Sequence, residues 1–264
     1  QKFEFEIQIE TEKGFSYHLF TENGSCDFFD FTTTFEEKRL IANINPKIPL
    51  KLISLKTVLP WECKKSDRIL LNGYQSWTAT RELTIKDRMY GINHVPMFLK
   101  KKYGHHNYGD YSFVDYSGKK GELHGFTFGY VRKGDVYNFV GSLDESNGYT
   151  ILKYSAKGQI LTIEKECGDL EISSAYTMVD AAFLSGSYDE IFDAWFAMQS
   201  KYHNFKKSEA KPMCGYTSWY NHYQNISEEI ILKDLEGMTS LPTKIDIFQI
   251  DDGYETAIGD WLSY

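Results

Sequence analysis

Residues 245–254 read Ile-Asp-Ile-Phe-Gln-Ile-Asp-Asp-Gly-Tyr. A short, β-branched, apolar run ends here in two adjacent carboxylates and a glycine. This pattern predicts a buried parallel strand that places Asp251 and Asp252 at its C-terminal tip. In α/β proteins the tips of such strands carry the chemistry, so the two acids are candidate site residues.

The segment before this strand predicts a strand, a helix and a second strand in that order. Residues 213–220 read Met-Cys-Gly-Tyr-Thr-Ser-Trp-Tyr, an aromatic-rich candidate strand. Ser227 is a candidate helix cap, since two acids follow it in the first turn. One apolar helical face then comprises Ile231, Leu235 and Met238. A unit of this length predicts two parallel strands joined by a right-handed crossover.

The chain carries four separated motifs in order: Asn72-Gly73-Tyr74-Gln75-Ser76-Trp77, Gly215-Tyr216-Thr217-Ser218-Trp219-Tyr220, Ile250-Asp251-Asp252-Gly253-Tyr254 and Gly259-Asp260-Trp261. The last three resemble the start of the catalytic barrel in melibiase-type α-galactosidases, glycoside hydrolase family 36. The first resembles the Gln-Ser-Trp loop in the N-terminal β-sandwich domain of that family. Together these motifs span most of the chain.

This resemblance implies a mostly β fold: a large antiparallel β-sandwich (a supersandwich), then a linker helix, then the start of a (β/α)8 TIM barrel that is incomplete in this chain. In the family the nucleophilic and acid/base aspartates lie on later barrel strands. The expected function is therefore the N-terminal portion of a retaining α-galactosidase acting on oligosaccharides of the melibiose or raffinose type. We expect no catalytic residue in this chain, and no hydrolysis by it alone. The implied partners are a galactoside substrate, the missing remainder of the barrel and, for the full protein, further copies in a homo-oligomer.

The geometry of a strand limits the role of Asp251 and Asp252. A retaining glycosidase needs two carboxyl groups about 5 Å apart across the scissile bond, whereas consecutive strand residues point to opposite faces. The two acids are better suited to accept hydrogen bonds from sugar hydroxyls. By resemblance they bind the hydroxyls of galactose at positions four and six. The alternative is that a carboxylate caps a backbone N–H at the strand end.

Four aromatic residues complete the predicted substrate site. Trp219 is expected at the tip of the first barrel strand, where an indole can wall a sugar pocket. Tyr254 and Trp261 are expected at the mouth of that pocket. Trp77 either reaches substrate from the sandwich or packs between the domains, and both alternatives stay open.

The rest of the chain predicts many short strands. Phe3, Phe5, Ile7 and Ile9 alternate with polar residues, and similar runs separated by turn signals follow at 15–20, 39–44, 50–59, 123–131, 136–143, 150–154, 159–166 and 170–178. Such a series is typical of an antiparallel sandwich, assigned to residues 1–186. Ser187 and Glu190 form a capping-box pattern before a helical face of Ile191, Trp195, Met198 and Tyr202. Residues 187–212 are thus predicted as linker helix and linker, and 213–264 as the first βαβ segment of the barrel.

Composition excludes several function classes. The 264 residues include 29 Lys and Arg and 37 Asp and Glu, and 29 minus 37 gives a net charge of −8. We therefore expect neither a nucleic acid nor an anionic membrane as a partner. The four cysteines have no CxxC spacing, so no metal and no disulfide framework are expected. We interpret the cysteines as buried thiols of a cytoplasmic protein, and we expect no cofactor. The sequence also contains no run of about 18 apolar residues and does not start with a signal-peptide pattern.

Two hypotheses from different classes remain. The first is the galactosidase portion described above. The alternative is a non-catalytic β-sandwich module that binds carbohydrate or another subunit, in which Asp251 and Asp252 merely end a strand. Transglycosylases, raffinose synthases and α-N-acetylgalactosaminidases share relatives of these motifs, so the substrate within the class stays open.

Overall fold

The chain is represented by a computed structural model that describes residues 2–75, 78, 80–91, 95–105, 109–203, 209–257 and 260. It divides into two compact units, residues 1–205 and 206–264.

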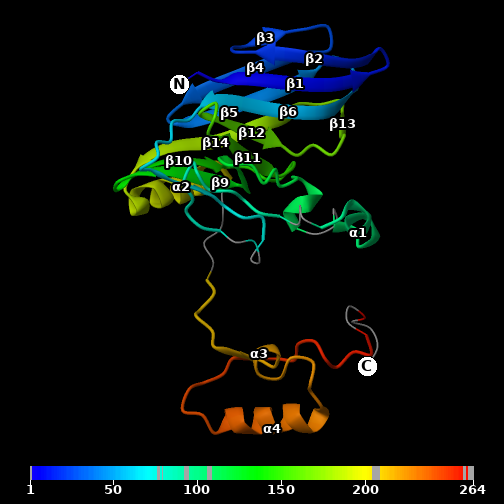
Figure 1. The fold of residues 1–264 in the computed structure, drawn as a ribbon, viewed down its shortest axis with the longest axis vertical. Coiled ribbons are helices and arrows are strands. Elements are labelled where there is room, and N and C mark those ends of the chain that lie inside the picture. The colour runs from blue at the N-terminus through cyan, green and yellow to red at the C-terminus, as the bar shows by residue number, and fades with distance from the viewer. Residues whose placement is uncertain are drawn as a thin grey trace. The chain divides into compact units, whose positions relative to one another are not determined.

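Two antiparallel sheets build the first unit (Figure 1). Within the described residues the first sheet has seven strands, with β13 paired to the side of β6: β2 (Gly14–Phe20), β1 (Glu4–Thr11), β6 (Leu50–Pro60), β12 (Ile160–Lys165), β11 (Thr150–Ser155), β8 (Glu122–Phe126) and β13 (Glu171–Ile172). The second sheet also has seven strands in the described part: β3 (Gly24–Ser25), β4 (Phe29–Glu36), β5 (Arg39–Pro46), β14 (Tyr176–Gly186), β10 (Val136–Ser142), β9 (Phe128–Lys133) and β7 (Arg68–Leu71). The prediction of a mostly β chain with large antiparallel sheets is confirmed.

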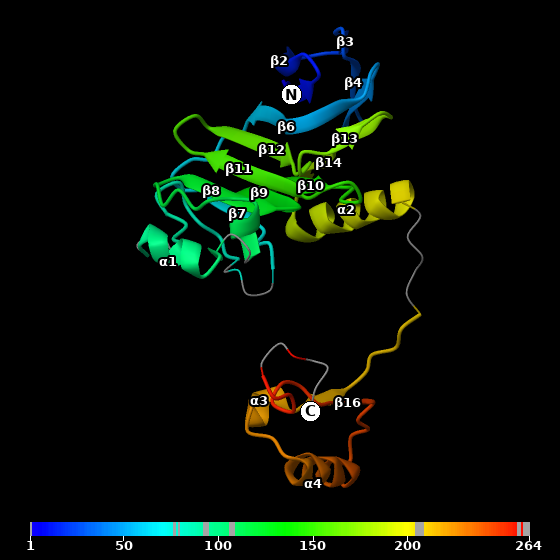
Figure 2. The same ribbon diagram turned by 90° about the vertical axis from the view of Figure 1, so that its right-hand side faces the viewer.

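The two sheets share one core because their strands alternate apolar and polar residues. Ile7 and Ile9 of β1 are fully buried, as are Ala42 and Ile44 of β5 in the opposite sheet. All four belong to a single apolar cluster to which both sheets contribute side chains. Figure 2 shows β6, β12 and β11 lying against β14 and β10.

The apolar run 123–131, expected as one strand, is two strands in different sheets. Thr127 lies between β8 and β9 with a φ of 67°, so the chain turns sharply there. Its N–H donates to Thr150 O of the first sheet at 2.9 Å, and its carbonyl accepts from Ser142 N of the second at 2.7 Å. A continuous apolar sequence cannot reveal this corner, because both halves are buried strands.

Helix α2 (Tyr188–His203) covers the outer face of the second sheet (Figure 2). Ile191 and Trp195 are buried against Phe139 of β10 and its neighbours, as their helical spacing predicts. The Trp195 indole donates to Ser142 O at 3.0 Å. Half of the capping box is present: Ser187 N–H donates to the Glu190 carboxylate at 2.8 Å, while the Ser187 hydroxyl donates to the same carboxylate at 2.9 Å instead of accepting from a backbone N–H. The helix expected as a linker is thus packed into the first unit.

A long excursion between β7 and β8 packs against the outer face of the first sheet. It contains α1 (Met97–Lys102) and a 3-10 turn, η2 (Gly109–Ser112). Phe113 packs against Phe126 of β8 with ring centroids 6.0 Å apart, and against Tyr74 at 5.1 Å. These contacts fix the excursion on β8 and β11.

The second unit is a strand, two helices and a strand: β15 (Gly215–Thr217), α3 (Trp219–His222), α4 (Glu228–Thr239) and β16 (Ile247–Gln249). The strands pair in parallel, with Gly215 opposite Ile247. Ser227 caps α4, its hydroxyl accepting from Ile230 N at 3.3 Å. The predicted strand–helix–strand order and the cap are confirmed.

Two details of this unit differ from expectation. Strand β16 ends at Gln249, so Asp251 and Asp252 follow it on a turn instead of continuing the strand. The strand is also not buried, since Ile247 is 46% exposed and Ile250 beyond it 48%. The two-stranded sheet is only partly covered by the other described residues of this unit. The side chains of Ile247 and Ile250 therefore stay accessible to solvent.

Candidate functional site at the ends of two parallel strands

The C-terminal ends of β15 and β16 are joined through Asp251. Its backbone N–H donates to Ser218 Oγ at 2.9 Å, and Ser218 N–H donates to Gln249 O at 3.1 Å. Its carboxylate accepts from Thr217 Oγ1 at 3.4 Å and from Gln249 Nε2 at 3.2 Å. Ser218 is fully buried. Asp251 is therefore held by side chains from both strand ends, in a position set by the parallel pairing.

Asp252 occupies a different environment one residue later. Its N–H donates to Asp251 Oδ1 at 2.9 Å. Burial, together with the nearby charges of Glu255 and Asp251, raises the pKa of the Asp252 carboxyl. Buried oxygens of Asp252 (Oδ1) and Glu255 (Oε1) have no hydrogen-bond partner among the described residues. The strand ends thus hold three neighbouring carboxyl groups, and two of them, Asp252 and Glu255, each carry a buried oxygen without a hydrogen-bond partner in the described part of the chain.

Gly253 permits the turn that brings these groups together. Its φ is 112°, a conformation that L side chains rarely adopt. A Cβ at this position would lie 2.8 Å from Cα and 2.8 Å from O of Gln224. The glycine therefore allows the acid-bearing turn to approach the loop that precedes α4.

The predicted aromatic residues are placed only in part. Trp219 directly follows Ser218 as the first residue of α3, half-buried, with its ring 5.3 Å from that of Tyr223. Tyr254 is 37% exposed and lines a hollow of about 450 Å³ together with Ile231 and Ile250. Trp77 and Trp261 lie outside the described residues.

A second polar cluster ties β15 to α4. Asp234 of α4 accepts from the Tyr216 hydroxyl and lies 2.6 Å from His222 Nε2. These two hydrogen bonds hold the pKa of Asp234 below its usual value. Burial and Asp234 together raise the pKa of Tyr216 to about 12. The Tyr216 ring also stacks on the Phe248 ring, with centroids 4.7 Å apart. These contacts hold β15 against both α4 and β16, and β15 and β16 are the strands that precede Ser218 and Asp251.

The first unit has its own polar cluster at the loop excursion. Asp110 is buried and accepts from Tyr116 OH at 2.6 Å, with His124 Nε2 at 3.1 Å and Thr78 Oγ1 at 3.3 Å. Burial alone would raise the pKa of Asp110, but these hydrogen bonds outweigh it and lower the pKa. The cluster adjoins a cavity of about 380 Å³ whose lining includes Arg81. Since Asp110 is saturated by its neighbours, its evident role is to fasten η2 to β8.

Three further findings bear on the site. No protein-family model matches the chain. Within the described ranges, no three His, Cys, Asp or Glu side chains are grouped so that they would hold a metal ion. None of the helices in the described part of the chain is long and apolar enough to cross a membrane.

Sequence reasoning identified the two aspartates but missed their partners. The partners of Asp251 lie in the quoted stretches of sequence: Thr217, Ser218 and Gln249. The sequence alone does not distinguish a serine that hydrogen-bonds to the ends of two strands from a serine that faces solvent. Glu255 was missed because its closeness to Asp252 depends on the turn at Gly253. That glycine, following two acids, was the available signal for a tight turn.

Proposed function

We propose that the chain is the N-terminal portion of a retaining α-galactosidase resembling the melibiase type, and that its second unit is the start of a (β/α)8 barrel. The observation that carries this proposal is the placement of Asp251. It follows the second of two parallel strands and is bonded to the residue that ends the first. Acids at the C-terminal edge of parallel strands are the usual site residues of such barrels.

The proposed role of these acids is recognition of the sugar. Asp251 accepts hydrogen bonds and has no proton to donate when ionised, which suits it to hold galactose hydroxyls. Burial and the neighbouring carboxylates raise the pKa of Asp252. Neither is assigned as nucleophile or acid, because a retaining enzyme needs two opposed carboxyl groups about 5 Å apart. In this proposal those groups come from outside the chain.

The remaining features of the expected site belong to the same proposal. Trp219 walls the sugar pocket, and Tyr254 lies at its mouth. The partners are an α-galactoside oligosaccharide, the rest of the barrel and further copies of the full protein, and the location is the cytoplasm. The carbohydrate-binding or subunit-binding module is the competing function. It is favoured by one observation, that residues 1–205 form a compact unit with their own core.

Asp251→Asn in the longer protein tests the role of the acids. The amide keeps the shape of the side chain and removes the charged acceptor, so kcat/KM for an α-galactoside should fall about tenfold or more while the melting temperature changes little. Asp246→Asn is the matched control. Asp246 precedes the same strand and accepts from Cys214 N at 3.2 Å at the opposite end. Unchanged kinetics in Asp251→Asn would remove that residue from the site.

A further inference from the structure

A separate polar cavity opens in the first unit where β6 leaves its sheet. Its volume is about 340 Å³, within the range of small-molecule sites. The apolar lining includes Trp61 and Phe183, which both pack on the core between the sheets, while the polar lining comprises Lys38, Glu62, Lys133, Asn138 and Ser185. Neither the motifs at the strand ends nor the proposed hydrolase activity involves any of these residues.

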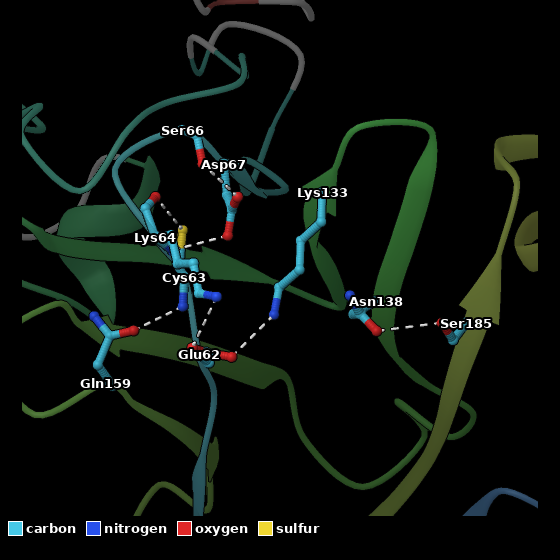
Figure 3. Close-up of polar contacts among 9 residues, drawn as sticks. All are labelled: Glu62, Cys63, Lys64, Ser66, Asp67, Lys133, Asn138, Gln159 and Ser185. Atoms are coloured by element: carbon cyan, nitrogen blue, oxygen red, sulfur yellow. Dashed lines mark hydrogen bonds and ion pairs between the residues drawn. The ribbon is translucent and has the colours of Figure 1, made fainter.

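Glu62 is the carboxylate of this cavity, and it is presented on a fixed turn (Figure 3). The adjacent Cys63 N–H donates to Gln159 Oε1 at 2.7 Å, and Lys64 N–H donates to Asp67 Oδ2 at 2.8 Å. Asp67 is itself buried. On the other side of Glu62, Trp61 N–H donates to Gln159 O at 2.7 Å. The turn is therefore held on both sides of Glu62, which limits the conformational freedom that a ligand would have to remove.

The Glu62 carboxylate is oriented but still accessible. Lys133 Nζ lies 3.3 Å from Oε2 and Lys64 Nζ lies 3.8 Å from Oε1. The Glu62 side chain is nevertheless 61% exposed. Each carboxylate oxygen has about two acceptor positions, so both oxygens can still accept from a ligand. Together with Lys38 of the lining, these ammonium groups outnumber the single carboxylate of Glu62.

Asn138 supplies donors beside this acceptor. The Ser185 hydroxyl donates to Asn138 Oδ1 at 3.2 Å, across the pairing of β10 with β14 (Figure 3). This contact turns the amide so that its NH2 group is left to donate. Lys38 adds an exposed ammonium, and its backbone is fixed because Phe183 N–H donates to Lys38 O at 2.8 Å.

The thiol nearby does not suggest covalent chemistry. Cys63 is buried, and burial raises the pKa of its thiol to about 11. A thiol with such a pKa is a poor nucleophile near neutral pH, because the thiolate is the reactive form. The cavity is therefore suited to binding and not to nucleophilic catalysis.

We infer that this cavity binds a neutral pyranoside unit. Neighbouring hydroxyls of a pyranose can donate to the Glu62 carboxylate and accept from the Asn138 amide, which matches the mixture of acceptor and donors. The apolar face of the ring can pack on Trp61. A neutral sugar leaves the Glu62 and Lys133 ion pair intact, because it brings no charge that competes for either partner. The inference does not depend on the proposed function of the second unit.

Saturation-transfer NMR with the 264-residue chain tests this inference, using methyl α-galactoside, methyl α-glucoside and methyl α-mannoside as probes. At least one should bind saturably, and Glu62→Gln should weaken that binding about tenfold. Glu12→Gln, which removes an exposed charge in the turn between β1 and β2, should leave it unchanged. Trp61→Phe should retain weaker binding, since a smaller aromatic face remains.

The contrary outcomes are equally specific. Absence of saturable binding for all three probes, or equal binding by wild type and Glu62→Gln, would overturn the inference. Stronger binding of galacturonate than of methyl α-galactoside would overturn its neutral character. Asp251→Asn should not alter binding at this cavity, so failure here is distinguishable from failure of the galactosidase proposal.

Discussion

Asp251 and Ser218 are joined by a hydrogen bond of 2.9 Å from the backbone amide of one to the buried hydroxyl of the other, although 33 residues separate them in sequence. The bond connects the ends of β15 and β16, and it holds the acid where the two strands meet. The position of the candidate site thus depends on a residue with no direct role in binding a ligand.

Ser218→Ala should loosen this end of the second unit. The variant removes the acceptor of the Asp251 amide, which should cost about 1 kcal/mol of local stability. Amide hydrogen exchange measured by NMR should then be faster at Asp251 than in the wild type. Exchange at Asp234 of α4, which is bonded elsewhere, serves as the internal reference. Unchanged exchange at Asp251 would contradict the assigned hydrogen bond.

Gly253→Ala should destabilise the turn that carries Asp251 and Asp252 more than a typical glycine-to-alanine substitution would. The new Cβ would lie 2.8 Å from backbone atoms of Gln224, and the residue would keep a positive φ. We expect a destabilisation of about 1–3 kcal/mol by chemical denaturation. Gly237→Ala is the matched control, since a Cβ there meets nothing within 4 Å in helix α4. That change should stabilise the unit by up to about 1 kcal/mol, and similar effects of both substitutions would refute the argument from close approach.

Asp110→Asn should reduce the acid sensitivity of the first unit. The pKa of Asp110 is lowered in the folded state, so its stabilising effect is present above the ordinary carboxyl pKa and is lost as the pH falls through the lowered value. As the pH falls from about 5 to about 3, the wild type should lose up to about 1 kcal/mol more stability than the variant. Urea unfolding at several pH values measures this. Glu22→Gln, a change at an exposed carboxylate, should follow the wild type, and parallel curves for all three proteins would exclude Asp110 as the cause.

The sequence predicted the parts of the fold that depend on local periodicity. The alternation from Phe3 to Glu10 gave β1, and the spacing of Ile191 and Trp195 gave the buried face of α2. The corner at Thr127 was not predicted, because both of its flanking strands are apolar. Strand β4 (Phe29–Glu36) was also missed, since its outer half is a run of threonines with few apolar residues.

The candidate site was predicted only where a motif carried it. Asp251 and Asp252 were predicted as site residues because they directly follow an apolar strand, at the edge where α/β proteins place their functional groups. The cavity beside Glu62 left no sequence signal, since Trp61, Asn138 and Ser185 come from distant strands. Such sites arise from tertiary packing, to which neither spacing nor composition is sensitive.

Hydrolysis of a chromogenic α-galactoside tests the proposed function most directly. The 264-residue chain should be compared with the protein encoded by the full reading frame that contains it. The account predicts no hydrolysis by the chain alone and release of the chromophore by the longer protein. Hydrolysis by the chain alone would contradict the assignment of the catalytic carboxyl groups to another segment, and no hydrolysis by either protein would contradict the galactosidase proposal itself.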